Sequence, residues 1–171
     1  MLKSIFIPGF LLFFKLCYGQ ELGLKYCTAL SDDKTLTAPY GAGIFFISND
    51  SAHKVNLLLS INFCYANRAI DKTDLHVSTL RFKYSIGILR VISSSQNIRF
   101  KIGPSVSYQT SVGSFDLHYM SAGLVLNLKF QSVFHSPLNF DCFLSPEYLF
   151  HVGEYKRPDV RIAGLDFGVS F

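Results

Sequence analysis

The chain has 171 residues, of which 49% are hydrophobic, 15% are aromatic and only 16% are charged. This high apolar content excludes a disordered chain. A formal net charge of +4, spread over the whole length without a basic cluster, excludes a nucleic-acid binder. The length fits a single domain.

Residues 1–20 are predicted to be a secretory signal peptide. Lys3 supplies the positive start, residues 5–14 are mostly apolar, and Tyr18-Gly19-Gln20 would precede the cleavage point. An uncleaved membrane anchor is the alternative, although the apolar run is too short to span a bilayer as a helix. The mature protein is therefore expected to be one domain over residues 21–171.

The body of this domain alternates between apolar and other residues along most of its length. The clearest example runs from Met120 to Phe130, where six apolar residues occupy consecutive even positions. Such a period of two is typical of β-strands. Reading the alternation together with the turn residues predicts eight strands, near residues 22–31, 40–49, 54–67, 75–91, 97–110, 117–130, 137–150 and 161–171. Pro104 and Pro146 fall inside two of them and are interpreted as rim or bulge positions.

An alternating all-β chain can close with its apolar face inward, as in a lipocalin-like carrier of an apolar ligand, or outward, as in an outer-membrane barrel. The apolar faces here are long and heavily aromatic, and would overfill the narrow interior of eight strands. Ten tilted residues also match the apolar thickness of a membrane. The sequence thus predicts an eight-stranded antiparallel up-and-down transmembrane β-barrel. Leu124→Arg should impair its assembly, whereas Gly123→Ser, on the opposite face, should be mild.

Three segments resemble a known family: the terminal residues 164–171, the end of the leader at residues 18–20, and the opening of the mature chain at residues 22–26. They are similar to the small outer-membrane β-barrel domain family, the porin-like and PorT-like group of Gram-negative envelopes. The resemblance implies a cell outer-membrane location. It also implies that the insertion machinery reads the terminal aromatic residue and the residues two and four before it, which here are Phe171, Val169 and Phe167.

The faces assigned above direct six basic and three acidic side chains into the lumen. Buried charges need partners, so these groups are expected to form salt bridges that plug the lumen. An anion-attracting passage is the alternative. The nine residues are Lys25, Arg81, Lys83, Arg99, Lys101, Lys129, Asp141, Glu147 and Asp166.

Catalytic and metal-binding patterns are weak in this chain. After the leader, Cys27, Cys64 and Cys142 are an odd and widely spaced set, so they are expected to be small apolar filler, and no cofactor or metal is expected. His76 and Ser78 share a strand face and would be the pair to use in a lipid-modifying barrel enzyme. They lack a clear carboxylate partner, so the protein is not expected to be an enzyme.

A structural or envelope-transport role follows from these expectations. The expected partners are outer-membrane lipid, the insertion machinery and, because PorT-like proteins are linked to secretion, an envelope or secretion-complex protein.

Overall fold

A computed structural model describes most of the expected mature domain. The described residues are 20–31, 40–48, 54–69, 76–112, 118–131, 138–152 and 160–171. Of the expected leader, residues 1–19 lie outside this set. The side chains of residues 31, 66–79, 111, 112, 151 and 160 also lie outside it, although the backbone of most of these residues is described.

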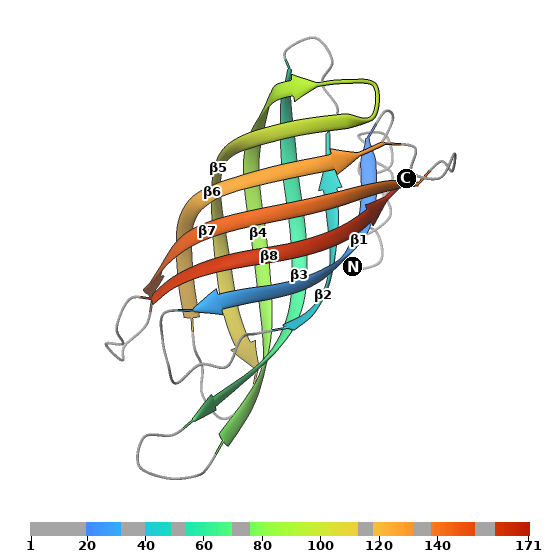
Figure 1. The fold of residues 1–171 in the computed structure, drawn as a ribbon. Helices are drawn as coiled ribbons and strands as arrows, with labels where there is room; N and C mark the ends of the chain where they lie inside the picture. The colour runs from blue at the N-terminus through green and yellow to red at the C-terminus, as the bar shows by residue number, and fades with distance from the viewer. Residues whose placement is uncertain are drawn as a thin grey trace, which may run out of the picture.

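Eight antiparallel strands close into a barrel in which each strand pairs with its neighbours in chain order and β8 pairs with β1 (Figure 1). This confirms the predicted fold class. The strands are β1 (Glu21–Ser31), β2 (Tyr40–Ile47), β3 (Val55–Ala69), β4 (His76–Ser94), β5 (Ile98–Val112), β6 (His118–Phe130), β7 (Asn139–His151) and β8 (Val160–Ser170). Within the described part of the chain, no helix is long and apolar enough to cross a membrane.

The barrel has two ends, which carry different connections. We call the end where β1 begins and β8 ends the proximal end. It also carries the connections β2–β3, β4–β5 and β6–β7. The distal end carries the four remaining connections, and the long β3–β4 hairpin extends there beyond the other strands (Figure 1).

The strand register fixes the tilt of the barrel wall. Following paired residues once around the barrel from Glu21 leads to Ile162 on β8 and then back to Ser31 on β1, which is 10 residues further along the strand. A shear of this size over eight strands tilts each strand by roughly 40° to the barrel axis, so one residue rises by about 2.5 Å along that axis. Each step to the next strand moves the paired position about 1.25 residues toward the distal end.

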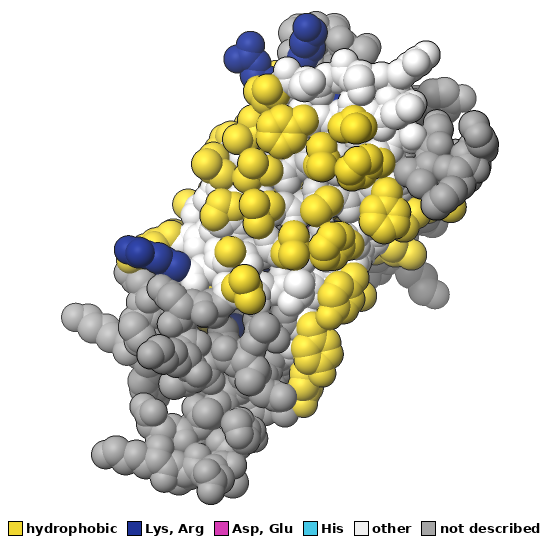
Figure 2. Space-filling view, viewed as in Figure 1, with side chains coloured by type: hydrophobic (Ala, Val, Ile, Leu, Met, Phe, Trp, Pro, Cys, Tyr) yellow, Lys and Arg dark blue, Asp and Glu magenta, His cyan; other side chains and the backbone are white. Residues whose placement is uncertain are grey.

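Side chains alternate between the two faces of the wall, as the sequence pattern predicts. On β1, for example, Leu22 and Leu24 are 42% and 65% exposed, whereas Glu21 and Lys25 are buried. The exposed large hydrophobic side chains lie on every strand, and Figure 2 shows them spread over the outer wall. The apolar face of this barrel therefore points outward.

Both strand prolines occupy the middle of the wall, which corrects the expectation of rim or bulge positions. Pro104 pairs with Leu124 on one side, and Pro146 pairs with Ala163. On its other side, each proline falls in a gap of the ladder, and the register resumes unchanged beyond the gap. A proline has no N–H to donate, so the wall loses local hydrogen bonds without shifting. The recorded register shift lies instead between Val91 and Ser93.

Candidate functional site in the barrel lumen

The nine charged residues expected in the lumen occupy inward positions, at different heights. Seven are buried, and Lys83 and Arg99 are half-buried. They do not form one continuous network. Lys101, Lys129 and Asp141 lie in the proximal half, whereas the groups around Glu147 and Asp166 lie in the distal half. An apolar layer separates the two sets.

The proximal cluster centres on Glu21, a residue that the sequence analysis did not include. Its carboxylate lies 2.8 Å from Lys129 Nζ and 3.5 Å from Lys101 Nζ. Asp141 accepts hydrogen bonds from Ser170 at 2.6 Å and from Asn127 at 3.1 Å. Extending the alternation of Lys25 and Gly23 back by one step would have placed Glu21 in the lumen as well.

The apolar layer consists of six buried residues that point inward from strands β2, β3, β4, β6 and β7 and pack together in one cluster. At its centre the rings of Phe45 and Phe143 meet edge to face, with centroids 4.9 Å apart. A Cβ at Gly23 or Gly168 would collide with the Phe45 ring, so these glycines make room for it. The layer, here called the plug, contains Phe45, Ile47, Leu58, Leu89, Val125 and Phe143. The expectation of a lumen plugged by salt bridges is therefore incomplete, because packed apolar side chains also fill it.

Ion pairs lie inside the lumen on the distal side of the plug. Lys25 Nζ lies 2.7 Å from Asp166 Oδ2 and 5.3 Å from the centre of the Phe143 ring, so this pair rests directly on the plug. Lys83 Nζ lies 2.5 Å from Glu147 Oε1. The other oxygen of Glu147 accepts hydrogen bonds from Ser121 and Ser107. Arg81, two residues before Lys83 on β4 and nearer the distal end, is also buried.

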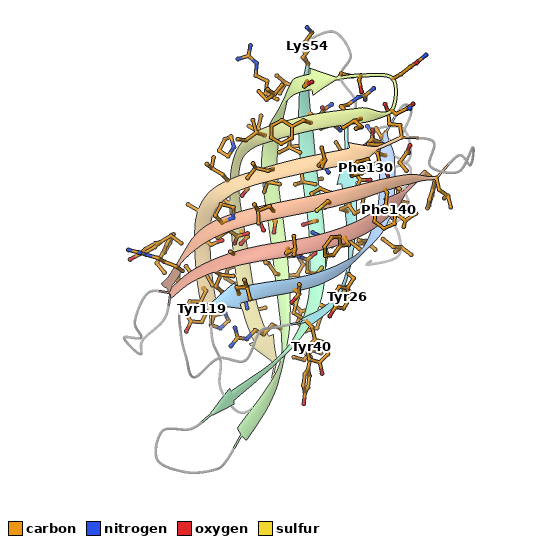
Figure 3. The ribbon with its side chains drawn as sticks, in the orientation of Figure 1. Tyr26, Tyr40, Lys54, Tyr119, Phe130 and Phe140 are labelled. Atoms are coloured by element: carbon orange, nitrogen blue, oxygen red, sulfur yellow. The ribbon has the colours of Figure 1, made fainter. Side chains whose placement is uncertain are left out.

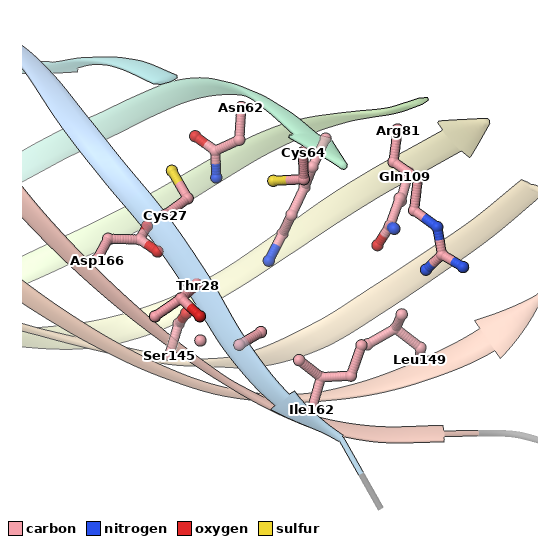
Figure 4. Close-up of a pocket in the computed structure, with 13 residues that line it drawn as sticks. Cys27, Thr28, Asn62, Cys64, Arg81, Gln109, Ser145, Leu149, Ile162 and Asp166 are labelled. Carbon is pink, nitrogen blue, oxygen red and sulfur yellow. The ribbon is translucent and has the colours of Figure 1, made fainter. Parts of the chain in front are cut away.

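A cavity of about 40 Å³ lies among these distal groups (Figure 4). We call it the distal chamber. A volume of this size holds about two or three water molecules. Asn62 is 4% exposed, and its Oδ1 has no hydrogen-bond partner. The lining is Cys27, Thr28, Ala29, Asn62, Cys64, Arg81, Lys83, Gln109, Ser145, Leu149, Ile162, Gly164 and Asp166.

The outer wall carries aromatic side chains toward both ends. Phenylalanines gather near the proximal end, where Phe130 pairs with Phe140 (Figure 3). Tyrosines dominate toward the distal end, where the Tyr40 and Tyr65 rings lie 5.7 Å apart. The three residues of the expected assembly signal, Phe167, Val169 and Phe171, lie on this outer face, with Phe171 65% exposed at the proximal end.

The described residues show no catalytic or metal-binding arrangement for the candidates named from the sequence. His76 and Ser78 pair with Ala69 and Asn67 in the β3–β4 ladder, but their side chains lie outside the described residues. Among the residues that are described, no group of three or more His, Cys, Asp and Glu side chains is placed to hold a metal ion.

The comparisons with known proteins show the fold. No protein-family model and no characterised protein matches the sequence. Among solved structures, Neisserial surface protein A aligns over 88% of this chain and 94% of its own, at 15% identity and a TM-score of 0.58. The outer membrane protein OprG from Pseudomonas aeruginosa aligns over 90% and 96%, at 12% identity and a TM-score of 0.54. The outer membrane enzyme PagL aligns over 85% and 97%, at 12% identity and a TM-score of 0.50. The chain thus has the fold of small outer-membrane barrels.

Proposed function

We propose that this protein is an integral outer-membrane β-barrel with a structural or envelope-transport role, exported by its leader and closed by its own side chains. The apolar belt on the outer wall carries this proposal. Arg90 on β4 and Arg161 on β8 are exposed near the proximal and distal limits of the belt. The strand register separates them by about nine residues, or roughly 22 Å along the axis. The apolar band of outer-membrane barrels is about 25 Å tall.

The interior argues against the soluble alternative. A lipocalin-like carrier needs an apolar cavity for its ligand and a polar outer face. This barrel has buried lysines and carboxylates inside, together with a plug of packed side chains. The distal chamber is small and lined by charged and polar groups. Lipid, rather than water, is the solvent that suits the outer wall.

The specific role rests on the resemblance to PorT-like proteins, which favours a place beside an envelope or secretion complex. In this proposal the insertion machinery recognises Phe167, Val169 and Phe171, and lipid surrounds the belt. PagL, which has a similar fold, is an enzyme. That likeness concerns the fold alone, so we propose a non-enzymatic role.

Cell fractionation tests the location. The protein should be recovered with the outer membrane and extracted by detergent, and an unboiled sample should migrate differently from a boiled one. Phe171→Ala should lower the folded fraction in the membrane, whereas Phe140→Ala, a change of the same kind elsewhere on the outer wall, should have less effect. A mature chain that stays folded and dispersed in plain buffer contradicts the proposal.

Conductance in planar lipid bilayers tests the closed lumen. The plug blocks the path between the two ends of the barrel, so the purified protein should show no steady ion current. Stable anion-selective openings would favour the passage and contradict the plug.

A further inference from the structure

One line of paired residues crosses five strands and faces the distal part of the lumen. Asp166 on β8 pairs with Cys27 on β1, and Cys27 pairs with Gly41 on β2. Gly41 pairs with Cys64 on β3, which in turn pairs with Arg81 on β4. Cys27 and Cys64 both line the distal chamber (Figure 4). The line therefore brings two cysteines, 37 residues apart in the sequence, to one small cavity.

Gly41 allows the two thiol groups to approach each other. It stands between the cysteines and has no side chain, and a Cβ there would collide with the backbone of Phe63 and Cys64. Both cysteines pair with Gly41, and both line the same small chamber. Cys27 is 3% exposed, and neither cysteine is in a disulfide.

A disulfide does not fit this arrangement. The two cysteines lie on strands separated by β2, so their Cα atoms are about 9–10 Å apart. A disulfide requires Cα atoms within roughly 7 Å. The barrel wall thus holds two thiols together and keeps them from joining, even in an oxidising compartment.

We propose that Cys27 and Cys64 bind one soft monovalent cation, Cu⁺ or Ag⁺, as a two-coordinate dithiolate site. Thiolate sulfur selects soft ions of this kind. Zinc sites use four ligands, and no set of three or more suitable side chains occurs among the described residues. Two sulfurs alone satisfy an ion that accepts two ligands in a nearly linear arrangement.

The charges around the chamber suit a monovalent ion. The five charged side chains in and beside it sum to +1 when all are ionised: Lys25, Arg81, Lys83, Glu147 and Asp166. Two thiolates and one monovalent cation add −1, which brings the total for these described groups to zero. A divalent ion would leave a buried excess of +1, which is costly at low dielectric.

Binding requires no redox step. The S–H bonds of Cys27 and Cys64 break, both protons leave to water, and two sulfur–metal bonds form while the metal keeps its oxidation state. The chamber has room for the water that carries these protons. Asn62 also lines the chamber, and its buried Oδ1 has no hydrogen-bond partner.

The test is a competition titration of the detergent-solubilised protein with Cu⁺ held by a colorimetric chelator under anaerobic, reducing conditions. One Cu⁺ should be withdrawn per chain. Cys27→Ser and Cys64→Ser should each weaken the binding by at least about 100-fold, because one sulfur is a poor site. Cys142→Ser is the matched control, since Cys142 lies on the outer face of β7, and its binding should equal that of the unchanged protein.

Alkylation followed by mass spectrometry tests the site in the unchanged protein, so the proposal does not depend on variants that fold. Bound Cu⁺ should protect Cys27 and Cys64, but not Cys142, from N-ethylmaleimide in partly denaturing detergent. Binding that survives both serine substitutions would overturn the proposal. So would equal alkylation of the three cysteines with and without Cu⁺, or a Cys27–Cys64 disulfide in the isolated protein.

Discussion

The two polar halves of the lumen differ in how they bury charge. In the proximal half, Lys101, Lys129 and Asp141 are no more than 1% exposed, and Glu21 serves two lysines at once. In the distal half, the acidic groups have separate partners: Lys25 pairs with Asp166, and Lys83 pairs with Glu147. Only the distal pairs stand beside the chamber.

Buried charged side chains therefore have two different surroundings in this lumen. In the densely packed proximal network, neither water nor another side chain can take the place of a charged group that is removed. A network beside a cavity admits water, which can solvate a group that has lost its partner. The plug divides the two environments. We therefore expect the proximal half to govern stability and the distal half to tolerate change and ligands.

Phe45→Ala should produce the largest effect, because it removes the centre of the plug. Truncating a buried phenylalanine costs about 3–5 kcal/mol of unfolding free energy. It also opens the space between the two halves, so ion current should appear where the unchanged protein shows none. Urea titration in micelles and planar-bilayer recording measure the two effects. Leu144→Ala, at an outward-facing position on β7, should cost less and leave the current absent. A Phe45→Ala barrel that is as stable as the unchanged protein and shows no ion current would mean that the plug does not block the lumen.

Glu21→Gln should cost about 3–5 kcal/mol, because it leaves two buried lysines without their shared carboxylate. Asp166→Asn is the matched change in the distal half. It should cost less, since Asp166 lines the chamber, so water there can reach the side of Lys25 that has lost its partner. Urea titration of both variants in the same detergent measures the difference. Equal losses of unfolding free energy would show that water solvates unpaired charges in the two halves to the same extent.

Leu124→Arg tests the outward face at mid-height on β6, where Leu124 is 48% exposed. Arginine at the bilayer midplane costs about 2–4 kcal/mol in such barrels. Leu124→Ala is the control and should fold nearly normally. Gly123→Ser is unsuitable for this purpose, which corrects the expectation of a mild effect, because a Cβ there would collide with the backbone of Pro146 and Glu147. Equal folding yields of Leu124→Arg and Leu124→Ala would place this surface in water.

The sequence predicts the strands well because period-two alternation is a local property. All eight expected strands are present, with boundaries within three residues of those observed. The plug was missed because its residues do not stand out locally. Phe45 lies in the unbroken apolar run Ile44–Ile47, where alternation cannot tell an inward residue from an outward one.

Contacts across the lumen depend on closure and register, which no local pattern contains. The nine expected charges could be assigned to a face from their strands alone. That Glu21 would meet Lys129 could not be foreseen, since they lie on strands β1 and β6. The shear of the closed barrel brings the start of β1 level with the end of β6. That Cys27 and Cys64 line one chamber depends in the same way on the register, which places Gly41 between them.

Lys101→Met should produce the smallest effect and gives the finest comparison within the proximal half. Lys101 Nζ is fully buried, has no hydrogen-bond partner and lies 3.5 Å from Glu21, whereas Lys129 Nζ lies 2.8 Å from the same carboxylate. Removing Lys101 takes away a poorly solvated charge and leaves the closer pair intact, so the stability should change by less than about 1 kcal/mol, or rise. Lys129→Met should cost more, because it removes the closer of the two lysine contacts with Glu21. If urea titration ranks the two variants in the opposite order, the longer pair is the one that supports the wall.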